Sequence, residues 1–446
     1  MQTNNRFTYP FVIILPVFLA LMWVYPPQVP AFSPPRPITE GSGFPDFPES
    51  VFTRRSYYDR ITGPVSEALR VEEDLVDEPG EKSMVGVSVE RGEEEIRFYF
   101  SSTGDLSPES ARRGDYEILR DKSEGEFISL KIHLKSGEDS YLLLQPENED
   151  YSRMDVYLLG SRFQRDIRVP YEFKELLRTS FASLMKSTAG YVDWEFYLPD
   201  PIISELSTGE AIAKAVRSYL PGLADVEDGA IDQKGNYVYI DDGSPQEGEG
   251  GLNCSGFAKW VVDGIYSTKT GSLLPIEILK KTHPDIRGHR WSAKYEDERQ
   301  PYFGLDWTRN LAFAMKRLRE SGADIRSADV DKLTYHEYKE NVGFPVESLG
   351  TLLYELAVRE PEHFYLGSVN GLDEEGELRT HYHVAVLFSW IDKEGRLGVS
   401  VMERGVETPL ERFIEKYKGE FIHLVRIKGT GSFSPPVQEP DPSLNR

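Results

Sequence analysis

The sequence predicts an α+β protein in which a β-rich domain precedes a second unit of mixed helices and strands. Short apolar runs with a period of two fill the region from about residue 83 to residue 160, a pattern typical of strands. Beyond residue 202, segments with helical spacing alternate with strongly apolar strands. The chain has 446 residues, of which 39% are hydrophobic, so it can bury sizeable cores.

The N-terminus is predicted to direct export. Residues 11–24 read FVIILPVFLALMWV, with Arg6 as the only charge before them. The run is short for a membrane-spanning helix, which needs about 20 apolar residues, and suits a secretory signal. We expect residues 1–31 to be a signal peptide cleaved after Ala31, or an anchor that holds the chain in a membrane through residues 11–25. Either outcome predicts a location in the periplasm or cell envelope.

Three segments lie between the signal and residue 202. Residues 32–75 begin with many prolines and glycines and are expected to form a tether. Residues 76–170 are expected to form a β-rich barrel or sandwich, because apolar strands alternate there with turn signals such as Ser136-Gly137. Residues 171–201 are expected to be a connecting helix and an extended linker. We find no catalytic constellation in these segments.

Charge and cysteine content narrow the function. The net charge is −23, which would repel a phosphate backbone, so no nucleic-acid partner is expected. The chain contains a single cysteine, Cys254. Exported proteins generally use cysteines in disulfide pairs, and Cys254 has no partner in its own chain. It is therefore an inert buried thiol, an intermolecular bridge or a nucleophile.

The surroundings of Cys254 favour a nucleophile. The stretch GGLNCSGFAKWV leads from a glycine-rich loop into a segment with helical spacing, and Asn253 is a suitable N-cap. A thiol at the N-terminus of a helix feels the positive end of the helix dipole, which lowers its pKa. Gly256 removes a side chain where a substrate could approach.

A thiol nucleophile needs a base, and His383 is the best candidate. It opens the apolar strand HVAVLFSW, and His381 precedes it on the same face by period two. A hairpin that pairs Ile391 with Arg396 brings Glu403 beside His383, where a carboxylate could orient the imidazole. The sequence leaves the register open by one residue.

Four pieces of sequence now occur in a recognisable order. They are NYVY at 236–239, NCSGFA at 253–258, LLP at 273–275 and HVAVL at 383–387. Together they resemble the NlpC-type family of papain-like cell-wall peptidases over about residues 202–428. The resemblance implies a papain-like domain with helices packed on an antiparallel sheet.

The resemblance also implies a reaction and its residues. The expected function is a cysteine peptidase that hydrolyses peptide bonds in peptidoglycan stem peptides through a thioacyl intermediate, with peptidoglycan or a muropeptide as substrate. By motif match, Cys254 is the nucleophile and His383 the general base. Tyr237, Asn253 and Ser255 surround the thiol and are expected to bind substrate or the oxyanion. We expect no metal and no cofactor.

The chain departs from the family pattern in several places. Asn253 stands where the family has an aspartate, and Glu403 is inferred from hairpin geometry and not from a motif. An insertion at about 282–360, with helical segments at 307–320 and 346–359, lengthens the interval from cysteine to histidine and is expected to cap the cleft or form a subdomain. Residues 429–446 are expected to be a disordered tail.

Other functions remain open from the sequence. Ser255 lacks the frame of a serine hydrolase, because Asn253 stands where a glycine should. His381, His383 and Glu403 could form a metal site, with few other ligands nearby. An acyltransferase or amidase could use the same scaffold and the same thioester chemistry. An inactive envelope-binding protein could retain the fold alone.

Overall fold

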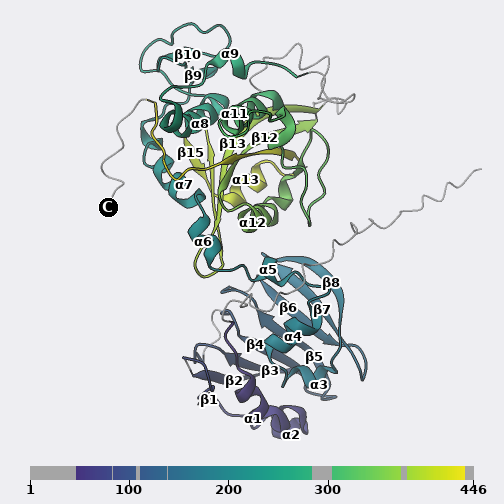
Figure 1. The fold of residues 1–446 in the computed structure, drawn as a ribbon. Coiled ribbons are helices and arrows are strands. Elements are labelled where there is room, and N and C mark those ends of the chain that lie inside the picture. The colour runs from purple at the N-terminus through teal and green to yellow at the C-terminus, as the bar shows by residue number, and fades with distance from the viewer. Residues whose placement is uncertain are drawn as a thin grey trace, which may run out of the picture.

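The computed structural model describes residues 47–82, 84–106, 111–137, 139–283, 304–372 and 379–436. The predicted signal or anchor lies outside these residues, as does the end of the predicted tail. Within the described ranges, no helix combines the length and apolarity needed to cross a membrane. The protein is α+β, as predicted, and Figure 1 shows two lobes that meet near α5 and α6.

The first lobe is built on one antiparallel sheet of eight strands. Each strand pairs with the next along the chain, so the order runs from β1 to β8. The strands are β1 (Asp74–Val76), β2 (Val85–Arg91), β3 (Glu95–Ser101), β4 (Tyr116–Asp121), β5 (Phe127–His133), β6 (Tyr141–Pro146), β7 (Ser152–Leu158) and β8 (Ser161–Val169). The predicted barrel or sandwich is corrected here, because the strands form a single sheet with β1 and β8 at its two ends.

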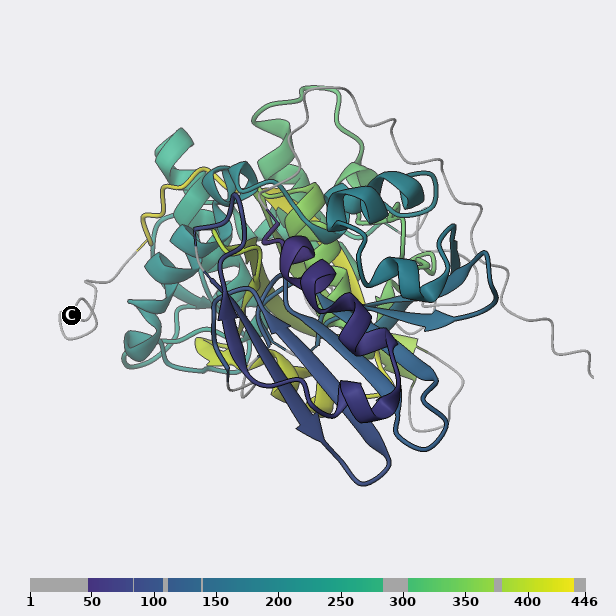
Figure 2. The same ribbon diagram turned by 90° about the horizontal axis from the view of Figure 1, so that it is seen from below.

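Helices supply the layer that a second sheet would supply in a sandwich. Alternate residues of the central strands are buried, and they share one hydrophobic core with the helices. Figure 2 shows α1 running along the sheet. The helices are α1 (Val51–Thr62), α2 (Val65–Ala68), α3 (Phe173–Leu176), α4 (Phe181–Thr188) and α5 (Trp194–Tyr197). Period-two patterning in the strands predicts one buried face but does not say what covers it.

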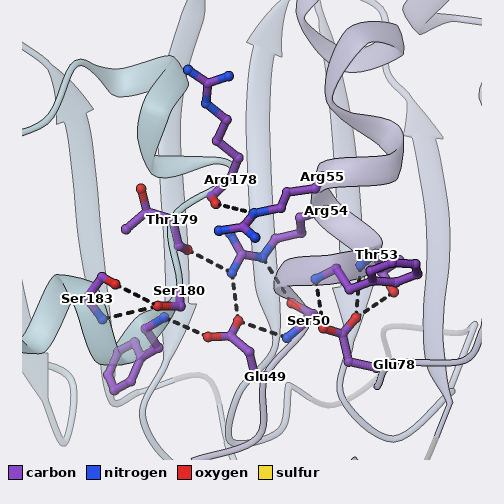
Figure 3. A network of polar contacts seen from close by, with 12 residues as sticks. Glu49, Ser50, Thr53, Arg54, Arg55, Glu78, Arg178, Thr179, Ser180 and Ser183 are labelled. Atoms are coloured by element: carbon purple, nitrogen blue, oxygen red, sulfur yellow. Dashed lines mark hydrogen bonds and ion pairs between the residues drawn. The ribbon is translucent and has the colours of Figure 1, made fainter. Parts of the chain in front are cut away.

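Buried Arg54 explains why the segment expected as a tether is folded from residue 47 onward. Its guanidinium donates to the carbonyl oxygen of Leu177 at 2.9 Å. It also donates to the carbonyl oxygen of Thr179 at 3.1 Å and pairs with Glu49 at 2.7 Å (Figure 3). Glu49 in turn accepts the backbone N–H of Phe181 at 2.7 Å. These contacts fasten α1 to the loop between α3 and α4. The connecting helix expected over 171–201 is therefore three short helices.

The second lobe contains a six-stranded antiparallel sheet in the order β11-β16-β12-β13-β14-β15. Its strands are β11 (Phe344–Pro345), β12 (His363–Leu372), β13 (Arg379–Ile391), β14 (Leu397–Glu403), β15 (Val406–Thr408) and β16 (Phe421–Lys428). A separate two-stranded hairpin is formed by β9 (Gly229–Ile231) and β10 (Tyr237–Tyr239). The predicted hairpin from His383 to Glu403 is β13 and β14.

Helices cover both faces of the six-stranded sheet. One face packs against α7 (Gly209–Arg217), α8 (Cys254–Thr270), α9 (Ile276–Leu279) and α11 (Leu305–Arg317). The other packs against α12 (Leu349–Arg359) and α13 (Leu410–Lys416). Shorter helices are α6 (Ile202–Leu206), η1 (Leu220–Gly222), η4 (Ile325–Ala328) and η5 (Val346–Ser348). Both predicted helices of the 282–360 insertion therefore belong to the core layers and form no separate cap.

The first part of the predicted tail is docked on α8. The ring of Phe433 meets Trp260 edge-on with centroids 5.3 Å apart, and Ser434 donates its N–H to the carbonyl oxygen of Gly264 at 2.7 Å. A Cβ at Gly264 would lie 2.2 Å from the Phe433 ring, so the glycine creates the space that the ring fills. The expectation of disorder is thus corrected for residues 429–436.

Candidate active site

Cys254 is the first residue of α8 and is fully buried. Asn253 caps the helix, as predicted, by accepting the N–H of Gly256 at 2.7 Å. The glycine also lets the helix approach the β9–β10 hairpin, because a Cβ there would lie 2.0 Å from the carbonyl oxygen of Gly229. The helix start that carries the thiol is therefore held against a hairpin from upstream in the chain.

The structure brings together the three residues predicted as catalytic. The side chain of His383 hydrogen-bonds the thiol of Cys254. Its Nε2 lies 2.7 Å from Oε1 of Glu403. Because Nε2 is hydrogen-bonded to Glu403, Nδ1 is the ring nitrogen that is available to bond the sulfur. A thiol, an imidazole and a carboxylate thus form a continuous hydrogen-bonded series, and all three residues are buried.

The hairpin register differs from the predicted one by one residue. Ile391 pairs with Leu397, and the ladder ends where Val386 pairs with Met402. Continuing this register places Glu403 opposite Ala385, on the same face as His383 and one diagonal step away. The alternative considered from the sequence would have set Glu403 directly opposite His383, but the observed shift runs in the other direction, and the contact is made by a diagonal.

A β-bulge separates His381 from His383, which corrects the prediction that the two share a face. Val369 of β12 pairs with His383, whereas the next residue, Asn370, pairs with His381. Consecutive residues of a strand point to opposite faces, so their partners do too, and Tyr382 is the extra residue of the bulge. The metal site considered from the sequence would have needed both histidines on the Glu403 side.

Glu403 is supported by residues that the sequence analysis missed. Its Oε1 accepts from Lys416 at 2.9 Å and from the Tyr417 hydroxyl at 2.8 Å, and its Oε2 accepts from Thr408 at 2.8 Å. The ring of Tyr417 also stacks on His383, with centroids 5.5 Å apart. These residues follow Glu403 closely in the chain. Their polar side chains, near an acid at the end of a strand, were the only sequence feature that could have indicated them as partners of Glu403.

The electrostatics favour a thiolate and an imidazolium. Burial alone would raise the pKa of Cys254, but hydrogen bonds from His383 and from the backbone of Val384 lower it below its ordinary value. Burial likewise opposes protonation of His383, yet its bonds to Cys254 and Glu403 raise the pKa of the imidazole. The pKa of Glu403 is strongly lowered despite its desolvation, chiefly by the hydrogen bond from His383.

The remaining predicted residues lie in the β9–β10 hairpin and at the start of α8. Tyr237 begins β10 and packs over Gly250, where a Cβ would meet its ring at 2.4 Å. Ser255 is fully buried in the first turn of α8, and its carbonyl oxygen accepts from Trp307 at 3.1 Å. The side-chain Nδ2 of Asn253 is buried and, within the described residues, has no hydrogen-bond partner.

Comparisons with known proteins concern the other lobe. A family model described as a domain of unknown function (DUF8515) matches residues 43–196. This span runs from before α1 into α5, so it joins the first sheet and its covering helices in one unit. No curated protein and no solved structure matches the chain.

Proposed function

We propose that the second lobe is a papain-like, NlpC-type cysteine hydrolase that cleaves peptide bonds of peptidoglycan stem peptides. The observation that carries the proposal is the series Cys254–His383–Glu403, in which a thiol at a helix N-terminus meets an imidazole oriented by a carboxylate. The four sequence pieces that resemble the family all lie in this lobe. Export to the cell envelope, proposed from residues 1–31, would bring the enzyme to this substrate.

The proposed chemistry uses the protonation states that the site favours. The Cys254 thiolate attacks the carbonyl carbon of the scissile amide, and the oxygen becomes an oxyanion. The backbone N–H of Cys254 and Nδ2 of Asn253 are the proposed donors to that oxyanion. His383 then gives its proton to the leaving amine as the C–N bond breaks, which leaves a thioester. Water, deprotonated by His383, attacks the thioester and releases the acid and the thiolate.

The test uses the purified full chain and the variants Cys254→Ala and His383→Gln. Each is incubated with defined stem peptides and with whole peptidoglycan, and products are identified by mass spectrometry. Cleavage by the wild-type chain and its loss in both variants is the expected result. A matched control is His363→Gln, at the opposite end of β12 from the site. Equal cleavage by wild type and Cys254→Ala would refute the proposal.

Acyl transfer is a second candidate, and the burial of Cys254 favours it. A thioester formed at a fully buried sulfur is shielded from water, so an amine acceptor that enters with the substrate can compete for it. The same incubation, repeated with an added amine such as glycine amide, separates the two reactions. Hydrolysis yields a free acid, whereas transfer yields an amide that is heavier than this acid by the mass of the acceptor minus one water.

A further inference from the structure

Arg404 occupies a constrained position beside the proposed catalytic residues. Glu403 pairs with Val406, so Arg404 and Gly405 alone form the turn between β14 and β15. Both turn residues have positive φ, 49° for Arg404 and 77° for Gly405. Such a turn favours asparagine or glycine at its first position, and an arginine is uncommon there. Because Glu403 is held by its four partners, the turn that follows it is fixed as well.

The Arg404 side chain forms a half-exposed ion pair. It pairs with Asp225 at 3.2 Å, and the two side chains are 50% and 48% exposed. The segment that contains Asp225 contacts both the Arg404 turn and the loop before Cys254. Leu223 packs beside Gly405, where a Cβ would lie 3.2 Å from the leucine Cβ, and the carbonyl oxygen of Ala224 accepts the N–H of Leu252 at 2.8 Å.

The segment 223–226 therefore bridges the Arg404 turn and the loop that leads into Cys254. A Cβ at Gly251 would lie 2.5 Å from Val226, so this loop and the segment are packed without a gap. The charge of Arg404 is near enough to the sulfur to favour its thiolate form. A cation on the turn that directly follows Glu403, with half of its surface in solvent, is placed to meet a substrate.

We infer that Arg404 is a specificity-determining residue that binds a carboxylate of the substrate beside the bond attacked by Cys254, in exchange for Asp225. The inference rests on the proposed function for the reaction and adds the class of substrate. An exposed ion pair such as Arg404–Asp225 contributes little net stability, so a second carboxylate can replace one partner. Guanidinium groups suit this exchange because they bind carboxylates in a bidentate manner.

The net charge of the chain strengthens the inference. With −23 overall, the protein repels anionic ligands at long range. A substrate that carries a carboxylate therefore needs a local cation at the site. Movement of Asp225 away from Arg404 would also loosen the segment that packs against the loop before Cys254, so binding and access to the thiol would be coupled.

The experiment compares alkylation of Cys254 by iodoacetate, which carries a carboxylate, and by iodoacetamide, its neutral counterpart. The two reagents respond alike to a change in thiol pKa, so the ratio of their rates reports the recognition of the carboxylate. We expect Arg404→Gln to lower the iodoacetate-to-iodoacetamide ratio roughly fivefold, the effect of one exposed ion pair. Asp225→Asn should raise the ratio by a similar factor, because it frees Arg404.

The opposite signs distinguish recognition from a structural role, since damage to the fold would move both variants in the same direction. Arg217→Gln is the matched control, because Arg217 also forms a half-exposed ion pair, with Glu407 of β15 at 2.5 Å. It should leave the ratio unchanged. An unchanged ratio in Arg404→Gln, or a wild-type thiol that reacts with neither reagent, would overturn the inference.

Failure of this inference and failure of the proposed function have different signatures. If the iodoacetate-to-iodoacetamide ratio depends on Arg404 but wall peptides are not cleaved, carboxylate recognition is supported and the proposed peptidase activity is refuted. If wild type and Arg404→Gln cleave stem peptides equally fast, with free and with amidated carboxylates, the peptidase activity is supported and carboxylate recognition by Arg404 is refuted. With both correct, Arg404→Gln raises KM for the free carboxylates only.

Discussion

At the scale of single residues, the site depends on how completely Glu403 is bonded. Oxygens of a buried carboxylate that lack donors are costly, and here both oxygens accept hydrogen bonds. Tyr417 has two functions in this arrangement, because its hydroxyl donates to Glu403 while its ring stacks on His383. The imidazole is thus fixed at its edge and on its face.

Tyr417→Phe separates these two functions. The substitution removes the hydroxyl and keeps the stacked ring, so we expect about 1 kcal/mol less unfolding free energy and a three- to tenfold slower alkylation of Cys254 near neutral pH. The pH at which alkylation reaches half its maximum should rise, because a less firmly held imidazolium stabilises the thiolate less. Stopped-flow alkylation from pH 4 to 10 measures this shift.

Tyr382→Phe is the matched control, because Tyr382 is the bulge residue next to His383. Among the described residues, the partners of Glu403 are His383, Thr408, Lys416 and Tyr417, so removal of the Tyr382 hydroxyl leaves the carboxylate bonded. It should leave the alkylation profile in place. Equal profiles for wild type and Tyr417→Phe would show that the Tyr417 hydroxyl does not help to position His383.

The sequence alone was enough to select Cys254, His383 and Glu403 as candidates, but not the residues that bond Glu403 from α13 and the segment after it. Cys254 stands out because it opens a helix after a glycine-rich loop, and His383 because it begins the apolar run within β13, four residues after that strand starts. Glu403 followed from the hairpin, whose turn signal limits the register to neighbouring alternatives. Tyr417 and Lys416 were out of reach, since they meet Glu403 only after α13 folds back against β14. The bulge at Tyr382 leaves no trace in a pattern of alternating residues.

At the scale of elements, α8 connects the site to the C-terminal segment. The helix carries Cys254 at its first residue and Gly264 in its third turn, where Phe433 docks. The sequence predicted the helix from its cap and apolar spacing. It did not predict the docking, because Pro- and Ser-rich composition around a single phenylalanine is also typical of disordered tails.

Phe433→Ala tests whether this docking stabilises the lobe. We expect the unfolding free energy to fall by roughly 2 kcal/mol, because a half-buried aromatic ring leaves Trp260 uncovered. Gly264→Ala should have a similar effect by displacing the ring. Thermal and urea unfolding measure the loss, and Phe433→Leu, which retains most of the apolar surface, is the control that should lose less than half as much. No change in any of the variants would mean that the segment adds nothing to stability.

At the scale of the whole molecule, the two lobes are joined by buried polar contacts as well as by the chain. Lys135 follows β5 of the first lobe, and its Nζ donates to the hydroxyl of Tyr354 on α12 at 2.6 Å. That hydroxyl donates to the carbonyl oxygen of Phe196 at 2.8 Å. Tyr354 also belongs to the core of the first lobe. The matched family span of 43–196 therefore ends where the first lobe meets the second.

Lys135→Met should stabilise the protein at neutral pH. Burial lowers the pKa of Lys135 to about 7, so between about pH 7 and 10.4 the unfolded chain binds a proton that the folded chain lacks. Stability from this group therefore rises with pH across that window, and below it the folded state carries a costly buried charge. Methionine removes the cost and leaves Tyr354 bonded to Phe196. We expect a gain of about 1–4 kcal/mol at pH 6.5, measured by urea unfolding.

The dependence on pH separates this explanation from a general gain in packing. The advantage of Lys135→Met should shrink as the pH approaches 9.5, because the wild-type lysine is then neutral in the folded state. Lys418→Met, at a well-exposed position, should alter stability little at either pH. A variant less stable than wild type at both values would mean that the Lys135–Tyr354 bond outweighs its desolvation. The junction of the lobes would then be held by that bond and not merely by their shared apolar core.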